Sequence, residues 1–243
     1  MVKKEHIAIS ILIIIIFIFG MLIVNETFLK TADSTDVSGI HRQVLSNSTD
    51  EPGTVEVIRN IGNPNGKKIA YVVGVHPLEN QTHQTLVKLL PNMTNLNNCY
   101  DIYIINVTED VGHYGDGSSD DSQGRQNGQN LAYKYVYPEI LNGGYNLAVD
   151  VHSNVGAYAF KTFVFSPVKE HISGEYANEV ADNCKNISYY APDSTTSGPF
   201  LTIPLNENGI PAFYFEEYSF ASQDEKDEHM MELILAVDKL KFR

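Results

Sequence analysis

Residues 67–90 read KKIAYVVGVHPLENQTHQTLVKLL, and this stretch decides the fold class. Its first half, IAYVVGV, is an almost unbroken apolar run, which is typical of a strand that is buried on both faces of a sheet. Its second half, NQTHQTLVKLL, predicts a helix that ends at Pro91, because proline does not continue a helix. A buried strand that leads directly into a helix is the repeating unit of a parallel sheet, so the stretch predicts an α/β fold.

The same alternation continues along the chain on both sides of this stretch. It predicts one domain, residues 55–243, with a mostly parallel mixed sheet and helices on both faces. Residues 110–124, which are rich in Gly, Asp and Ser, predict a mobile lid. The strands are predicted at residues 54–62, 67–76, 100–108, 145–153, 161–166 and 211–217, and the helices at 80–90, 128–141, 168–184 and 224–240.

The composition excludes several classes of protein. The 243 residues include 30 Asp and Glu but only 17 Lys and Arg, for a net charge of −13. This charge repels phosphates, so no nucleic-acid partner is expected. Gly and Pro are near their average frequencies and no internal repeat is evident, which excludes collagen-like, low-complexity and coiled-coil proteins.

The N-terminus carries an apolar run that is set apart from the domain. Residues 7–24 read IAISILIIIIFIFGMLIV and follow Lys3 and Lys4. At about 1.5 Å per residue the run is about 27 Å long, close to the thickness of a bilayer core. Lysines that flank a membrane span favour the cytoplasmic side, which would place the domain outside the cytoplasm. Residues 1–24 therefore predict an uncleaved single-pass anchor in the cell membrane. A cleaved signal peptide is the alternative. The polar residues 25–54 predict a stalk.

Two cysteines, Cys99 and Cys184, lie far apart in the sequence and lack the C-x-x-C spacing of a thiolate metal site. Outside the cytoplasm they could form one disulfide. Two separate buried thiols are the alternative.

Polar side chains stand at the carboxyl ends of three predicted strands. The first strand ends in GVHPLE (residues 74–79), the second in DVHS (150–153) and the third in FEEY (215–218). Because functional residues of such sheets gather where the carboxyl ends of strands open into loops, we expect these side chains to converge. Two histidines and a carboxylate are the ligands of an open catalytic zinc site, and a nearby unligated carboxylate would accept a proton. Each motif alone is also typical of an ordinary loop, so the prediction depends on all three together.

These strings resemble the zinc carboxypeptidases, especially their succinylglutamate desuccinylase/aspartoacylase branch. The family has a strand ending in Gly-x-His-x-x-Glu, a later strand ending in Asp-x-His and a last strand ending in a catalytic glutamate. The matching strings here are GVHPLE, VDVHS and FYFEE, and the resemblance covers roughly residues 68–220. It implies one zinc ion per chain, held by His76, Glu79 and His152.

The resemblance also implies that a glutamate of FYFEE is the general base and acid. Strand alternation puts Glu216 on one face of the strand and Glu217 on the other. The family's string aligns best with Glu216, which we predict to be the base. Glu217 is the alternative.

Arg125 is the candidate for binding a substrate carboxylate. Selectivity for a terminal carboxylate requires a planar, bidentate cation, which arginine supplies better than lysine. Of the four arginines, only Arg125 lies between the proposed ligands in the sequence. Its segment, SQGRQNGQNLAYKYV, resembles the one in which the family carries carboxylate- or oxyanion-binding Asn and Arg residues, although the family's Asn-Arg dipeptide is absent. An ordinary position near the start of a helix is the alternative.

The function that the resemblance implies is hydrolysis of an amide bond in a peptide or an N-acyl amino acid. In this chemistry zinc lowers the pKa of a water molecule and polarises the substrate carbonyl, while the glutamate moves the water's proton to the leaving amine. A surface binding or adhesion module on the same scaffold, without turnover, is the alternative. Two roles are open for His83, four residues after Glu79: it is a partner of Glu79 or a further metal ligand.

Overall fold

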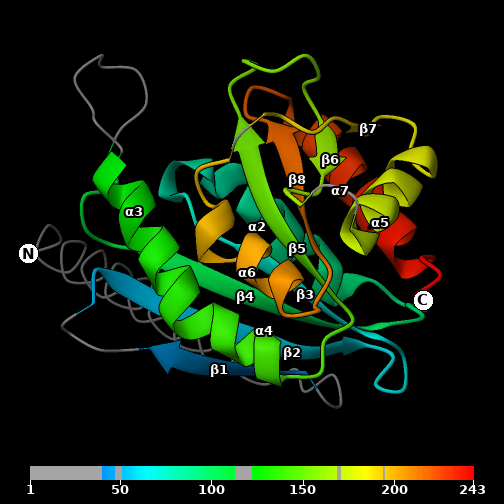
Figure 1. The fold of residues 1–243 in the computed structure, drawn as a ribbon, viewed down its shortest axis with the longest axis horizontal. Helices are drawn as coiled ribbons and strands as arrows, with labels where there is room; N and C mark the ends of the chain where they lie inside the picture. Colours follow the sequence, from blue (N-terminus) through cyan, green and yellow to red (C-terminus); the bar gives the residue numbers. More distant parts are fainter. Residues whose placement is uncertain (1–39, 47–50, 113–121, 169–170, 194) are drawn as a thin grey trace, which may run out of the picture. The chain divides into compact units, whose positions relative to one another are not determined.

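The computed structural model describes residues 40–46, 51–112, 122–168, 171–193 and 195–243, which form one sheet with helices on both faces (Figure 1). The strands are β1 (His41–Ser46), β2 (Gly53–Gly62), β3 (Lys68–Val73), β4 (Cys99–Val107), β5 (Leu147–Asn154), β6 (Phe163–Phe165), β7 (Ser188–Tyr189) and β8 (Ala212–Tyr218). The helices are α2 (Asn80–Leu89), α3 (Ser122–Leu131), α4 (Tyr137–Asn142), α5 (Ile172–Asp182), α6 (Thr202–Glu207) and α7 (Gln223–Asp238). Short helical turns are η1 (Pro77–Glu79), η2 (Leu90–Asn92), η3 (Ala132–Val136) and η4 (Gly198–Phe200).

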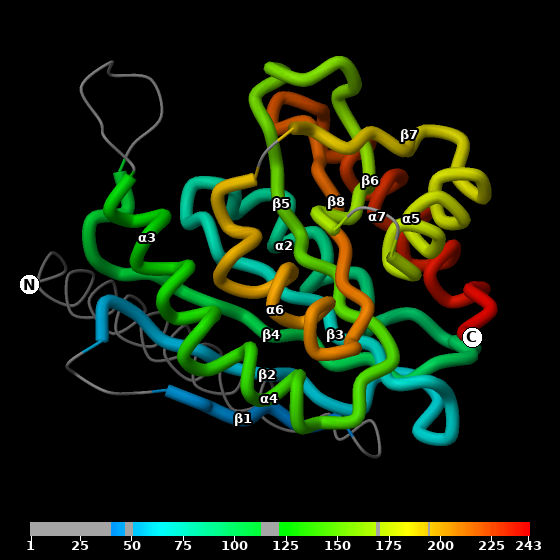
Figure 2. Tube along the Cα trace, viewed as in Figure 1, coloured from blue at the N-terminus to red at the C-terminus, as the bar shows by residue number. Residues whose placement is uncertain are grey.

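The strands are ordered β1-β2-β4-β3-β5-β8-β6-β7 across the sheet. The centre of the sheet, β4-β3-β5-β8, is parallel. β1 and β2 on one side and β6 on the other are joined to it by antiparallel pairing. In Figure 2 the orange β8 runs beside the green β5, although α5 and α6 separate them in the sequence. This topology brings the carboxyl ends of β3, β5 and β8 to one edge, as predicted from the sequence.

The sheet is buried on both faces, and β3 shows why. Its residues Ile69, Tyr71 and Val73 pack into the core that the sheet forms with α2, α5 and α7. Ala70 and Val72 point the other way, into the core with α3, α4 and α6. Each valine or isoleucine side chain buried in this way contributes about 1.5–3 kcal/mol. The predicted α/β class, with a mostly parallel mixed sheet covered on both faces, is confirmed.

The predicted stalk, residues 25–54, is wrong at its C-terminal end. β1 and the first residues of β2 belong to the sheet, and the compact unit begins at residue 40 rather than 55. β1 pairs with β2 at the edge of the sheet and has mostly exposed side chains, including Arg42, which bonds to Glu56. Such a strand is held by backbone hydrogen bonds rather than by buried side chains, so its sequence lacks apolar periodicity. Residues 25–39 and 47–50 lie outside the described residues.

Other boundaries differ where the local signal is weak. The helix predicted to begin at residue 128 begins at Ser122, so Arg125 lies within α3 rather than before it. β7 and α6 are missed because elements of two and six residues are too short to show a period. Most of the predicted lid, residues 113–121, lies outside the described residues.

Within the part of the chain that the structure describes, none of the helices combines the length and the apolar character of a membrane span. The predicted anchor at residues 7–24 lies outside that part. The anchor therefore stays a prediction.

The two cysteines are free thiols in the structure. Cys99 is buried at the start of β4, and Cys184 is partly buried just beyond α5. Burial raises the pKa of Cys184 to about 12, so this thiol stays protonated at neutral pH. Of the two alternatives, the structure has two separate thiols.

Candidate metal centre

His76 and Glu79 lie just beyond β3, where the chain turns away from the sheet. The turn requires Gly74, whose φ is +90° and whose Cβ, if it had one, would lie 1.8 Å from the carbonyl oxygen of Ile105. The 3₁₀ turn η1 follows, and the N–H of Glu79 donates to the carbonyl of His76 over 3.1 Å. This turn brings Glu79 Oε1 to 2.9 Å from Nδ1 of His76. The His-x-x-Glu spacing thus places both side chains at one point by local geometry alone.

His152 reaches the same point from the neighbouring strand. β5 pairs in parallel with β3, and His152 lies near its carboxyl end. Its Nδ1 is 3.0 Å from Nδ1 of His76 and 3.0 Å from Oε2 of Glu79. Its other ring nitrogen, Nε2, lies 3.1 Å from Oδ1 of Asp150, close enough for an ion pair although not at the angle of a hydrogen bond. Asp150 is on the same face of β5, two residues earlier.

The arrangement of these three side chains fits a metal ion. Among the described residues, His76, Glu79 and His152 are the one group of three histidine, cysteine or carboxylate side chains whose ligand atoms all lie within 4.8 Å of one another, and all three are buried. Four tetrahedral ligands at zinc-like bond lengths are about 3.3 Å apart. Nδ1 of His152 lies 3.0 Å from Nδ1 of His76, so this pair would need to widen by only a few tenths of an ångström. Glu79 contacts the two histidines through different oxygens, Oε1 toward His76 and Oε2 toward His152, and either oxygen can be its ligand atom. Three protein ligands would leave a fourth position for a water molecule or substrate.

Charges in this group are strongly coupled. Burial alone would raise the pKa of Glu79, but the adjacent His76 and His152 hold it well below its usual range. Burial also acts to lower the pKa of His152, yet Asp150 and Glu79 outweigh it and raise that pKa well above its usual range. For His76 burial prevails and the pKa is lowered. The raised pKa of His152 and the lowered pKa of Glu79 share one cause, the close approach of this carboxylate to the imidazole rings.

Glu216 stands beside His152 at the end of β8. The two residues are directly paired in the parallel β5–β8 ladder, and both line the same cavity. Oε2 of Glu216 is buried and has no hydrogen-bond partner among the described residues. A buried oxygen of this kind needs a partner from water or a ligand. Burial raises the pKa of Glu216 to about 8, which suits a group that takes up and returns a proton near neutral pH.

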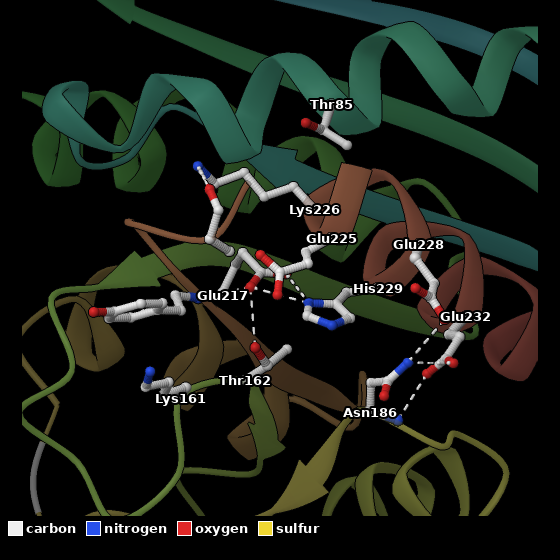
Figure 3. Close-up of polar contacts among 12 residues, drawn as sticks. Thr85, Lys161, Thr162, Asn186, Glu217, Glu225, Lys226, Glu228, His229 and Glu232 are labelled. Carbon is white, nitrogen blue, oxygen red and sulfur yellow. Dashed lines mark hydrogen bonds and ion pairs between the residues drawn. The ribbon is translucent and has the colours of Figure 1, made fainter. Parts of the chain in front are cut away.

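Glu217, the alternative base, follows Glu216 on β8 and therefore points to the opposite face of that strand. Figure 3 shows it beside Thr162 and His229. There it is buried and accepts hydrogen bonds from Thr162 Oγ1 over 3.0 Å, from the N–H of Tyr218 over 2.8 Å and from Nδ1 of His229 over 3.0 Å. The hydrogen bond to Glu217 raises the pKa of His229. Glu217 therefore links β8 to α7, and both of its carboxylate oxygens already accept hydrogen bonds.

Arg125 reaches the site from α3. Its NH1 lies 3.4 Å from Oε1 of Glu79, and its NH2 donates to Thr196 Oγ1 over 3.2 Å. The helix can approach this closely because residue 128 is glycine: a Cβ on Gly128 would lie 2.0 Å from the carbonyl oxygen of Val75. The structure thus places Arg125 at the rim of the candidate site, in contact with one of the proposed ligands.

His83, in contrast, has a structural partner. It is buried on α2, and its Nε2 donates to the carbonyl of Val151 over 3.1 Å, while it lies 4.0 Å from Oε2 of Glu79. Burial lowers the pKa of His83 to about 4, so the ring is neutral at physiological pH. His83 is not a member of the metal-ligand group.

A cavity of about 300 Å³ opens above the three side chains. One wall is aromatic, where Phe165 and Tyr214 stack with ring centroids 4.8 Å apart. Arg125 also lines the cavity. The remaining lining is rich in hydroxyl groups, which come from Tyr158, Thr195, Thr196 and Ser197. The cavity is large enough for a short stretch of peptide or an acylated amino acid.

Comparison with known proteins identifies the fold. No protein-family model matches the sequence, and no curated protein matches it. The metallo-carboxypeptidase of Burkholderia cenocepacia superposes with a TM-score of 0.57 over 88% of this chain and 67% of that chain, at 12% identity. A Burkholderia mallei protein assigned as a carboxypeptidase superposes with a TM-score of 0.58 over 88% of this chain and 66% of that chain, also at 12% identity. This chain has the metallo-carboxypeptidase fold.

A third structure agrees over a greater share of its own length. A Shewanella amazonensis protein assigned as a metallopeptidase superposes over 88% of this chain and 91% of that chain, with a TM-score of 0.51 and 11% identity. Identities this low establish the shared fold alone. The resemblance deduced from GVHPLE, VDVHS and FYFEE is thereby confirmed for the fold.

Three partners of the proposed ligands were missed by the sequence analysis. Asp150 lies beside His152, and the Asp-x-His spacing, which puts both on one face of a strand, could have indicated it. The N–H of Ser153 donates to Oε2 of Glu79 over 2.9 Å. The amide nitrogen of Gln129, on α3, lies 3.3 Å from Nε2 of His76. No sequence signal indicates Gln129, because its helix is remote from β3 in the chain.

Proposed function

We propose that this chain is a zinc-dependent hydrolase that cleaves an amide bond of a peptide or an N-acyl amino acid. The observation that carries the proposal is the convergence of His76, Glu79 and His152 beside Glu216, whose buried Oε2 has no hydrogen-bond partner in the part of the chain that the structure describes. His76, Glu79 and His152 would hold one zinc ion per chain. Bound there, the ion would supply an acidified water molecule and polarise the substrate carbonyl.

The protein groups around this centre have separate roles. Glu216 takes the proton of the attacking water and passes it to the leaving nitrogen, for which a pKa near 8 is suitable. Asp150 and the N–H of Ser153 orient His152 and Glu79. Arg125 lies at the cavity rim, where its guanidinium can bind a substrate carboxylate through two hydrogen bonds.

Substrates paired as free acids and amides test the role of Arg125. We expect the zinc-loaded full-length protein to hydrolyse N-blocked dipeptides and N-acyl amino acids with a free carboxylate. Arg125→Lys should lower kcat/KM for these acids by about 10- to 100-fold, since an ammonium loses a charged, bidentate hydrogen bond. Hydrolysis of the matching amides should change little. Zinc content is measured in parallel, because Arg125 also contacts Glu79.

If acids and amides lose activity equally at unchanged zinc content, Arg125 acts on the reacting carbonyl or on Glu79. The chain is then a general amidohydrolase rather than a carboxypeptidase. If the zinc-loaded wild-type protein hydrolyses neither series, the alternative applies: a binding or adhesion module on the same scaffold.

The proposal includes a location outside the cytoplasm, anchored in the cell membrane. It is supported by the apolar residues 7–24 and the preceding Lys3 and Lys4. A protease added to intact cells should remove the domain while leaving the anchor, as read on blots with a tag at each end of the chain. Protection of the domain until the cells are lysed would contradict this orientation.

A further inference from the structure

Helix α3 carries a side chain that contacts the rear of one proposed ligand. Gln129 is 5% exposed, and its amide nitrogen lies 3.3 Å from Nε2 of His76. This is the ring nitrogen that faces away from Glu79 and His152, since Nδ1 of His76 makes both of those contacts. Arg125, one turn earlier on α3, contacts Glu79. The helix thus contacts two of the three proposed ligands.

The chemistry of imidazole defines what a partner at Nε2 must do. A neutral histidine binds a metal through the ring nitrogen that carries no proton, and the other nitrogen then carries it. If His76 binds through Nδ1, its Nε2 becomes an N–H that needs an acceptor. A glutamine amide has an oxygen as well as a nitrogen, and rotation of the amide by about 180° exchanges the two. Gln129 can therefore accept from Nε2–H of His76 without any movement of the backbone.

We infer that Gln129 is a positioning residue that holds His76 in the tautomer whose Nδ1 is free to bind the metal. The inference rests on the proposed function, because it assumes that His76 is a ligand. It distinguishes the two histidines: His152 has a carboxylate, Asp150, at its outer nitrogen, whereas His76 has a neutral amide. A carboxylate that accepts the outer N–H of a ligating histidine makes the ring more basic, and a neutral amide does so less. Nδ1 of His76 would therefore donate less electron density to the ion than Nδ1 of His152.

The packing of α3 supports a specific role for this contact. Gly128, the residue before Gln129, lies against the carbonyl of Val75, the residue before His76. The backbones of the two segments are therefore in direct contact, and the amide of Gln129 has little freedom to move away from the ring. Gln126, on the same helix, instead donates to the exposed Asn130 over 2.9 Å.

Zinc affinity, measured by competition with a chromophoric chelator, tests the inference on the full-length protein. Gln129→Met keeps the length of the side chain but removes the acceptor, and it should weaken zinc binding by about 10- to 100-fold, the usual effect of losing a ligand's hydrogen-bond partner. Gln129→Glu supplies an acceptor that is always available and should bind zinc at least as tightly as wild type. Gln126→Met is the matched control and should leave the affinity unchanged. Thermal unfolding of each zinc-free variant shows that it is folded.

Two outcomes would overturn the inference: wild-type zinc affinity in Gln129→Met, or equal weakening in Gln129→Met and Gln129→Glu. The second would mean that Gln129 acts by shape alone. If Gln129→Met does not fold, Gln129→Glu still decides, because weaker binding than wild type contradicts the proposed tautomer. Failure of the proposed function is distinguishable. If the metal site is wrong, the wild-type protein binds no zinc, and if only the hydrolase activity is wrong, the zinc affinities still decide the role of Gln129, because they are measured without a substrate.

Discussion

Replacement of His152 by alanine is expected to abolish metal binding. His152 supplies one of three convergent ligand atoms, and its Nδ1 is the atom that lies 3.0 Å from both His76 and Glu79. Without it, two ligands remain and Asp150 loses the ring that separates it from the site. Zinc per chain, determined by elemental analysis after dialysis of the zinc-loaded full-length protein, should fall from about one to a background level.

The control for this variant is a second buried histidine nearby. His83 lies 4.0 Å from Oε2 of Glu79 but donates to a backbone carbonyl, so His83→Gln should keep its zinc even if it unfolds at a lower temperature. Loss of zinc in both variants would show that general disruption, rather than ligation by His152, explains the first result. Absence of zinc in the wild-type protein would remove the basis of the hydrolase proposal.

Replacement of Glu216 by glutamine is expected to stop turnover while zinc binding persists. Glutamine keeps the shape of the side chain and leaves all three proposed ligands intact, but it cannot take a proton from water. The value of kcat per zinc-loaded molecule should fall by about 10²-fold or more, the usual contribution of a positioned general base. The measurement is a progress curve on an N-blocked dipeptide, normalised to the zinc content of the same sample.

Glu217→Gln is the matched control, one residue further along the same strand. It weakens the contacts of Glu217 with Thr162 and His229, so stability should fall. The kcat of its folded, zinc-loaded fraction should stay within a few-fold of wild type, since Glu217 faces away from the cavity. A collapse of kcat in Glu217→Gln with little change in Glu216→Gln would mean that the base was assigned to the wrong face of β8.

The two glutamates show how far sequence reasoning extends. Alternation along a strand separates Glu216 from Glu217 on any strand, because successive side chains point to opposite faces. It does not say which face is the site. That depends on the pairing of β5 with β8, which puts Glu216 beside His152, and on α7, whose His229 binds Glu217.

β1 illustrates a different limit of sequence reasoning. Its polar residues read as part of a stalk because an edge strand needs few buried side chains, and its place in the sheet depends on the backbone of β2. A protein shortened to begin at residue 55 would lose β1 and the first residues of β2, and would expose an edge of the sheet.

By itself, the sequence determined the α/β class, the central strands and the local pair His76 and Glu79. These follow from short-range rules: apolar runs, helix ends and a spacing of three residues that a single turn brings together. The order of the strands also led us to expect His152 near that pair, and the structure gives the 3.0 Å contact. Only the tertiary structure decided that Gln129 lies behind His76 and that Arg125 lies against Glu79. The physical reason is that local pattern specifies the direction of each side chain within its own element. The distance between side chains on different elements depends on how those elements pack, and here that includes the close approach of α3 at Gly128.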